Sequence, residues 1–171
     1  MRLPRPAESD YDAFYRGYVA RCLDRDILAE LAAQIATAER LLRPLDDTAA
    51  RYRYAPGKWS VKEVVGHLVD TERLFAYRAT SIARSDRTEL PGIDQDQWLA
   101  GADFDRLPLS DLLDEFTHLR RATVLFCRGL SAESLARRGV ANGKSITVLA
   151  LPYITAGHSG HHLEVIERKY R

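Results

Sequence analysis

Histidines are the residues of this chain whose type and spacing point most directly to chemistry. Three of the five lie in one short segment, GHSGHH, at positions 157–162. Residues four apart on a helix lie one above the other, so His158 and His162 project to the same side and can bind one divalent ion at about 2.0–2.1 Å. His161 points about 60° away from that line. The spacing therefore predicts a site built from His158 and His162.

A third histidine, His67, lies on the inner stripe of an earlier amphipathic segment, one turn from Val64. Alone, such a residue is more often a core histidine than a ligand. Three neutral imidazoles in one apolar bundle would leave several nitrogens without partners, and one metal ion satisfies them together. Three histidine ligands also leave a coordination position open, as in catalytic zinc sites. The metal set is thus His67, His158 and His162, and we identify no catalytic residue beyond it.

Helical periodicity supplies the elements that must position these histidines. Apolar residues recur three or four apart in four long segments and one short one. The spacing predicts long helices over about 28–42, 60–84, 110–129 and 145 to the C-terminus, and a short aromatic helix over 11–19. Asp24 or Asp26 can cap the first long helix, and Ser60 with Glu63 forms a capping box for the second. We expect Pro152 to kink the last helix.

The connection between the second and third long helices is long, from Ser85 to Leu109. About 25 residues can span a bundle and restart the chain in the same sense. The fold class is therefore predicted to be all-α, a four-helix bundle with up-down-down-up topology and a crossover between helices 2 and 3. Asp94, Gln95 and Asp96 lie in this crossover, which we expect to lap over the metal site. The segment 139–145 resembles a phosphate loop but has three residues between its glycines instead of four, and we interpret it as a helix start.

The composition of the chain limits the classes of function that the protein can have. The chain has 171 residues, 46% of them hydrophobic, and a formal net charge of +1, which predicts a single domain over 1–171 and argues against a nucleic-acid partner. No secretory signal or 18-residue apolar stretch is visible, so we expect a cytoplasmic protein with no membrane partner. Two widely separated cysteines fit a reducing compartment.

Two segments together resemble the DinB/YfiT-like superfamily. They are YAPGKWSVKEVVGHLVDTER at 54–73 and AGHSGHHL at 156–163. The resemblance covers most of the chain and implies an up-down-down-up four-helix bundle, frequent homodimers, and a divalent metal held by three histidines. Carried over residue by residue, the ligands are His67, His158 and His162.

The resemblance implies a metal-dependent enzyme acting on a small molecule. Some members resemble thiol transferases that activate a low-molecular-weight thiol, and others are metal-dependent hydrolases. We expect zinc or nickel, with manganese or iron as further options. The alternative is a non-catalytic stress-response or dimerisation bundle with a structural metal or none. Since unperturbed histidine has a pKa near 6.5, we expect metal to be lost as the pH falls from about 6 to 5.

Spacing also points to residues around the ligands. Asp70 can accept the second N–H of His67, or can be a solvated carboxylate. Arg78 lies nearly in line with His67 and can hold an anionic part of a substrate, or can form an ion pair with an acidic residue. His161 is expected at the rim or as a hydrogen-bond donor, and His118 is expected to face solvent.

Overall fold

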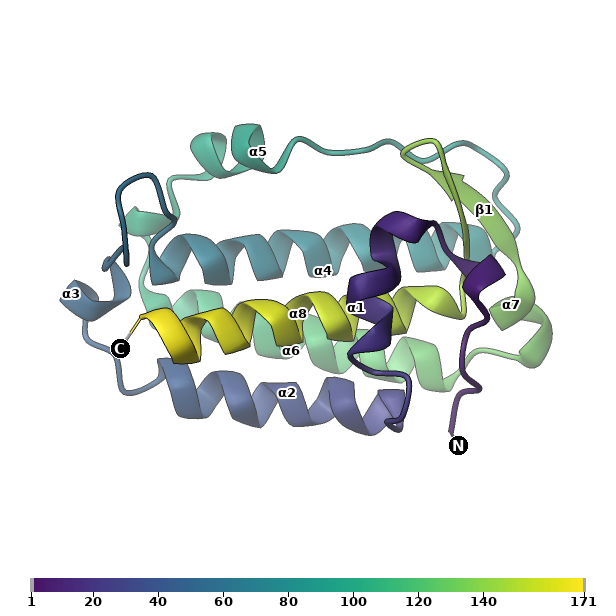
Figure 1. Cartoon of the computed structure of the whole chain (residues 1–171), viewed down its shortest axis with the longest axis horizontal. Helices are drawn as coiled ribbons and strands as arrows, with labels where there is room; N and C mark the ends of the chain where they lie inside the picture. Colours follow the sequence, from purple (N-terminus) through teal and green to yellow (C-terminus); the bar gives the residue numbers. More distant parts are fainter. Residues whose placement is uncertain (1, 171) are drawn as a thin grey trace.

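The computed structural model describes residues 2–170 and contains four long helices arranged side by side (Figure 1). They are α2 (Ile27–Leu42), α4 (Val61–Ala83), α6 (Leu109–Arg128) and α8 (Ala150–Lys169). The shorter elements are η1 (Glu8–Asp10), η2 (Ala13–Tyr15), α1 (Arg16–Ala20), α3 (Asp47–Ala50), α5 (Gln95–Ala102), η3 (Phe104–Arg106), α7 (Ala132–Ala136), β1 (Arg138–Ala141) and β2 (Lys144–Thr147). Within the described residues, no helix has both the length and the apolar character needed to span a bilayer. The predicted four-helix bundle is confirmed.

The helix directions follow the up-down-down-up order. Figure 1 shows α4 and α6 running one way and α2 and α8 running the other. Hydrogen bonds agree: Gln34 of α2 donates to the carbonyl of Ala156 in α8 at 2.8 Å, and Arg40, further along α2, contacts Glu167, further along α8, at 3.1 Å. The two helices of this pair are therefore parallel, whereas α4 and α8 are antiparallel, so that the middles of α4 and α8 meet.

The predicted helix starts are confirmed where a side chain caps them. The Asp26 carboxylate accepts from the backbone N–H groups of Leu28 and Ala29 at 3.1 and 3.4 Å. The Ser60 hydroxyl accepts from the Glu63 N–H at 3.0 Å, and the Glu63 carboxylate accepts from the Ser60 N–H at 2.7 Å. These caps satisfy backbone donors that have no partner within the helix. They fix the start, and hence the inward-facing stripe, of each helix.

The interpretation of 139–145 as a helix start was wrong. β1 and β2 form an antiparallel hairpin, with Ala141 opposite Lys144. The turn residues Asn142 and Gly143 both have positive φ, 54° and 68°, the conformation that an Asn-Gly pair adopts readily in a two-residue hairpin turn. The bundle thus carries a small sheet at the end where α8 begins.

The predicted kink at Pro152 also loses its basis. Because α8 begins at Ala150, Pro152 lies in the first turn, where the missing N–H has no helical acceptor to lose. The aromatic helix predicted over 11–19 is divided into η2 and α1. α1 packs tightly on α8: a Cβ added at Gly157 would lie 2.0 Å from the carbonyl oxygen of Tyr18, so only glycine fits there.

The long crossover is held against the hairpin. The Leu90 N–H donates to the Val140 carbonyl, and the Asn142 N–H donates to the Leu90 carbonyl, both at 2.9 Å. The chain then passes along the bundle to α5, whose first turn is capped by Asp94 (Figure 1). This path places the crossover over α4, one of the two helices that carry the histidines.

A buried arginine ties the four long helices together. Arg120 of α6 is fully buried, and its guanidinium donates to both carboxylate oxygens of Glu72 in α4 at 2.8–3.1 Å. It also donates to Gln34 Oε1 of α2 at 2.6 Å and to Ser159 Oγ of α8 at 2.7 Å. Ser159 is the neighbour of His158, so this network anchors the part of α8 that carries a predicted ligand.

Replacing Glu72 with glutamine should reduce the free energy of unfolding by about 3 to 5 kcal/mol, because it leaves the Arg120 charge buried without its counter-charge. Urea unfolding of the metal-free protein measures the loss. The matched control is Glu115→Gln, whose exposed carboxylate pairs with Arg73 and whose loss should cost less than about 1 kcal/mol. Equal, small losses in both variants would show that Arg120 reaches water.

Candidate metal centre

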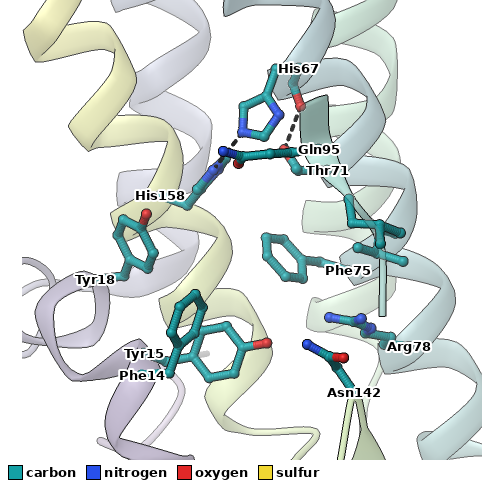
Figure 2. Close-up of a pocket in the computed structure, with 12 residues that line it drawn as sticks. Phe14, Tyr15, Tyr18, His67, Thr71, Phe75, Arg78, Gln95, Asn142 and His158 are labelled. Carbon is teal, nitrogen blue, oxygen red and sulfur yellow. Dashed lines mark hydrogen bonds between the residues drawn. The ribbon is translucent and has the colours of Figure 1, made fainter. Parts of the chain in front are cut away.

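The three predicted ligands converge between α4 and α8. His67 projects from α4, and His158 and His162 project from successive turns of α8. One nitrogen of each ring lies within 4.8 Å of the others, and the Nε2 atoms of His67 and His158 are 3.0 Å apart (Figure 2). The antiparallel packing of α4 and α8 together with the four-residue spacing on α8 accounts for this convergence.

The cluster is neutral at pH 7. Burial lowers the pKa of His67 to about 4. Burial, followed by the proximity of His67 and His161, lowers the pKa of His162 to about 3. The pKa of His158 is also well below its ordinary value, first through burial and then through the neighbouring histidines. Since metal ions bind neutral imidazole, no proton has to be removed before a metal binds at this pH.

Aromatic rings lie against all three histidines of the cluster. The Trp59 ring is stacked on His162, with an interplanar angle of 11° and centroids 6.3 Å apart. Tyr18 and Phe75 meet His158 edge-on, with centroids 5.3 and 6.0 Å from its ring. Sequence reasoning assigned these rings no role at the site, although Trp59 directly precedes the capping box that starts α4.

The donor set fits a divalent metal. Within residues 2–170, these histidines form the one group of three or more metal-binding side chains close enough to share an ion. When neutral, His67 and His158 can form a single hydrogen bond through the facing Nε2 atoms, and His162 adds a further lone pair. An ion would accept all three lone pairs. Three imidazoles suit zinc, nickel, copper or iron better than calcium or magnesium.

Two cavities reach the cluster from different sides. One, of about 310 Å³, is lined by His67 and His158, and the other, of about 330 Å³, is lined by His161 and His162. Gln95, the first residue of α5, lines both. The expectation that the crossover laps over the site therefore holds for Gln95, whereas Asp94 caps α5 and Asp96 lines the second cavity only.

The other candidate residues have different surroundings. Within the described residues, Asp70 makes no hydrogen bond to His67. Its carboxylate lies 3.7 Å from the Arg73 guanidinium, and burial raises the pKa of this carboxyl. His161 lies at the rim, with its ring 6.2 Å from that of Tyr18, and it is not in the three-histidine group. Exposed His118 contacts the Asp114 carbonyl.

Arg78 lies in the first cavity and is almost fully buried. Both sequence-based expectations for it involved a charged partner, yet its one hydrogen bond among the described residues goes to a backbone carbonyl, that of Pro91, at 2.8 Å.

This protein is thus a four-helix bundle with a cluster of two buried histidines and one half-buried histidine between antiparallel helices. The chain belongs to the DinB superfamily, whose family model matches residues 30–166. No match was found among curated proteins.

Two solved structures share the fold. YfiT from Bacillus subtilis, described as a probable metal-dependent hydrolase with an unusual four-helix bundle topology, is 20% identical, with a TM-score of 0.71 over 96% of this chain and 90% of that one. A mycothiol-dependent maleylpyruvate isomerase is 12% identical, with a TM-score of 0.67 over 81% of this chain and 58% of that one. At these identities the likeness is one of fold.

Proposed function

We propose that this protein is a metal-dependent enzyme that acts on a small molecule, with the metal held by His67, His158 and His162. The observation that carries the proposal is the convergence of three neutral imidazole nitrogens within 4.8 Å of one another, beside two cavities that these histidines line. A structural site would be closed by a fourth protein ligand. Within the described residues, no cysteine or carboxylate joins this group.

A divalent ion bound there would supply Lewis acidity, which lowers the pKa of a water or thiol at its open position. The chain's own residues provide the rest of the environment. Tyr18, Trp59 and Phe75 place apolar ring surface beside the imidazoles, which lowers the local dielectric constant and strengthens electrostatic interactions inside the site. Arg120 fixes α8 beside His158 through Ser159.

The reaction is proposed to be thiol transfer or hydrolysis. Both accord with the descriptions of the two structural relatives, one a probable metal-dependent hydrolase and the other a mycothiol-dependent enzyme. Zinc or nickel is the proposed ion because imidazole ligands favour these metals over manganese. A homodimer in the cytoplasm, with the whole chain as one domain, remains a prediction.

Metal analysis tests the proposal first. The untagged protein is treated with a chelator, dialysed against Zn²⁺ or Ni²⁺, and its metal content is measured by mass spectrometry. We expect about one equivalent per chain, as for a site with a full set of neutral ligands. Less than about 0.2 equivalents of either metal would refute a metal-dependent enzyme and favour a non-catalytic bundle.

An activity screen of the metal-loaded protein then separates the chemistries. One arm pairs glutathione and other low-molecular-weight thiols with monochlorobimane or 1-chloro-2,4-dinitrobenzene. The other arm offers ester and amide panels. Turnover should disappear on chelation and return with metal. Turnover that persists in the metal-free protein would place the activity elsewhere.

A further inference from the structure

Arg78 is a buried cation without a counter-charge. It is 3% exposed, and no described carboxylate lies within ion-pair distance of its guanidinium. The Pro91 carbonyl accepts one N–H from Nη2, while the buried Nε has no hydrogen-bond partner. A buried charge normally has a paired opposite charge, because removing it from water is costly. Arg120 in the same bundle shows the usual solution, since it pairs with Glu72 and both side chains are fully buried.

The guanidinium lines the cavity that begins at the histidines. The ring centroid of Phe75 lies 6.0 Å from the ring centroid of His158 and 6.0 Å from Cζ of Arg78. The His158 ring centroid and the Arg78 Cζ atom are therefore no more than twice that distance apart. Figure 2 shows His67 and His158 at one end and Arg78 at the other. A small molecule of ordinary size can span them within about 310 Å³.

Two more polar groups point to the Arg78 end. Figure 2 shows the Tyr15 hydroxyl and the Asn142 amide nitrogen directed into it. The Asn142 side chain lies close over Gly92 of the crossover, where a Cβ would lie 2.1 Å from its Oδ1 atom. The guanidinium, the phenol hydroxyl and the amide can each donate hydrogen bonds at this end. Between the two ends the lining is mostly apolar, from Tyr18, Leu74, Phe75 and Ile93.

We propose that Arg78, with Asn142 and Tyr15, forms a subsite for the carboxylate of an organic acid substrate whose apolar middle lies on Phe75. A carboxylate matches the planar fork of the guanidinium and supplies the missing counter-charge. The placement of the reacting group at the histidine end rests on the proposed function, but the carboxylate subsite itself stands without a metal.

The competing explanation is that Arg78 only fastens the crossover to α4 through Pro91. One neutral carbonyl does not balance a buried charge, and a fastening role would need no donors from the hairpin turn and η2 facing the same space. Fastening predicts equal binding of an acid and its amide. A carboxylate subsite predicts a preference for the acid.

The test measures the binding of 4-(trifluoromethyl)phenylacetate and of the corresponding amide to the protein. The titration of each compound is monitored by ¹⁹F NMR. Both are measured with zinc-loaded and with chelator-treated protein, so that binding of the acid to a metal is separated from binding to Arg78. In the chelator-treated wild type, the acid should bind at least about tenfold more tightly than the amide. Arg78→Gln should abolish that preference and leave amide binding within about twofold.

Two further variants complete the design. Arg84→Gln removes one exposed positive charge just after the same helix and should leave the preference intact. Asn142→Asp keeps a residue suited to this turn but places a negative charge in the cavity that Arg78 lines, so it should abolish acid binding even if Arg78→Gln does not fold. Folding is checked by circular dichroism.

The outcomes are distinct. Equal binding of acid and amide by the wild type, or a preference that survives Arg78→Gln and Asn142→Asp, would overturn the subsite. If Arg84→Gln loses the preference for the acid as fully as Arg78→Gln does, the preference reflects general charge attraction. That result would also overturn the proposed subsite. Failure of the wild type to bind Zn²⁺ would refute the proposed function, while the acid preference of the chelator-treated protein would still report on the subsite.

Discussion

Replacing His158 or His162 with alanine should abolish stoichiometric metal binding. Each substitution removes one of three imidazoles that lie within 4.8 Å of one another. Loss of an outer partner of a ligand typically costs 10- to 100-fold in metal affinity, so loss of a ligand itself should exceed about 100-fold. His67→Ala should weaken binding comparably. Competition of the protein with a chromogenic zinc chelator gives the dissociation constants.

The chain supplies its own controls for this series. His118→Ala alters an exposed ring that contacts the Asp114 carbonyl and should leave affinity unchanged. His161→Ala removes a rim residue outside the group and should have a smaller effect than the ligand variants. If His161→Ala proves as damaging as His162→Ala, the assignment of the ligand face on α8 is wrong. All variants should keep the helical circular dichroism spectrum, because two buried apolar clusters hold the helices together.

The parts of the site that could be predicted from the sequence are those set by local spacing. The interval of four residues between His158 and His162 places them on one face of any helix. The capping box at Ser60 fixes the start of α4, and with it the stripe on which His67 lies. The length of the crossover indicates that the second and third long helices run in the same direction. Together these local features are sufficient to bring the three histidines to one place.

The hairpin could have been predicted but was not. Asn142-Gly143 is a strong short-range hairpin signal, and the four-residue strands beside it are too short for alternation to stand out. The glycines and Lys144 of this segment resemble a phosphate loop in composition, which hides the hairpin. Because β1 and β2 occupy 138–147, α8 begins at Ala150, five residues after the predicted start at about 145.

The pairing of the two buried arginines could not be predicted, because it depends on packing between distant segments. Arg120 and Arg78 both lie on amphipathic helices, and neither has an acidic residue within one helical turn of it in the sequence. In the folded chain, Glu72 of another helix neutralises Arg120, whereas the crossover brings only a carbonyl to Arg78. The same dependence on packing explains why the pKa values of the histidines are so far from the ordinary value.

Those pKa values change the acid behaviour expected of the metal site. With pKa values of about 4 for His67 and about 3 for His162 in the metal-free fold, protons compete for the ligand nitrogens only at low pH. The zinc-loaded protein should therefore retain its metal throughout the range from about pH 6 to 5, in which unperturbed histidines would release it. Metal content after dialysis at each pH measures this. Half-loss above pH 5.5 would show that water reaches the imidazoles.

The same pKa values predict a loss of stability in acid for the metal-free protein. In the unfolded chain each histidine binds a proton near pH 6.5, whereas in the fold His67 and His162 stay neutral down to about pH 4 and 3. Between these limits the unfolded state binds more protons, so the free energy of unfolding falls as the pH falls. Each buried histidine should add a slope of about 1.4 kcal/mol per pH unit.

Urea unfolding between pH 6 and 5 isolates this slope, because most carboxylates titrate below that range. His67→Gln and His162→Gln should each lower the slope by about the contribution of one histidine, whatever their effect on stability at pH 7. His118→Gln, which alters an exposed ring outside the cluster, is the matched control substitution. A slope insensitive to His67 and His162 would mean that both rings take up protons in the fold. The cluster would then be hydrated and cationic in mild acid, and the premise of a preformed set of neutral ligands would be lost.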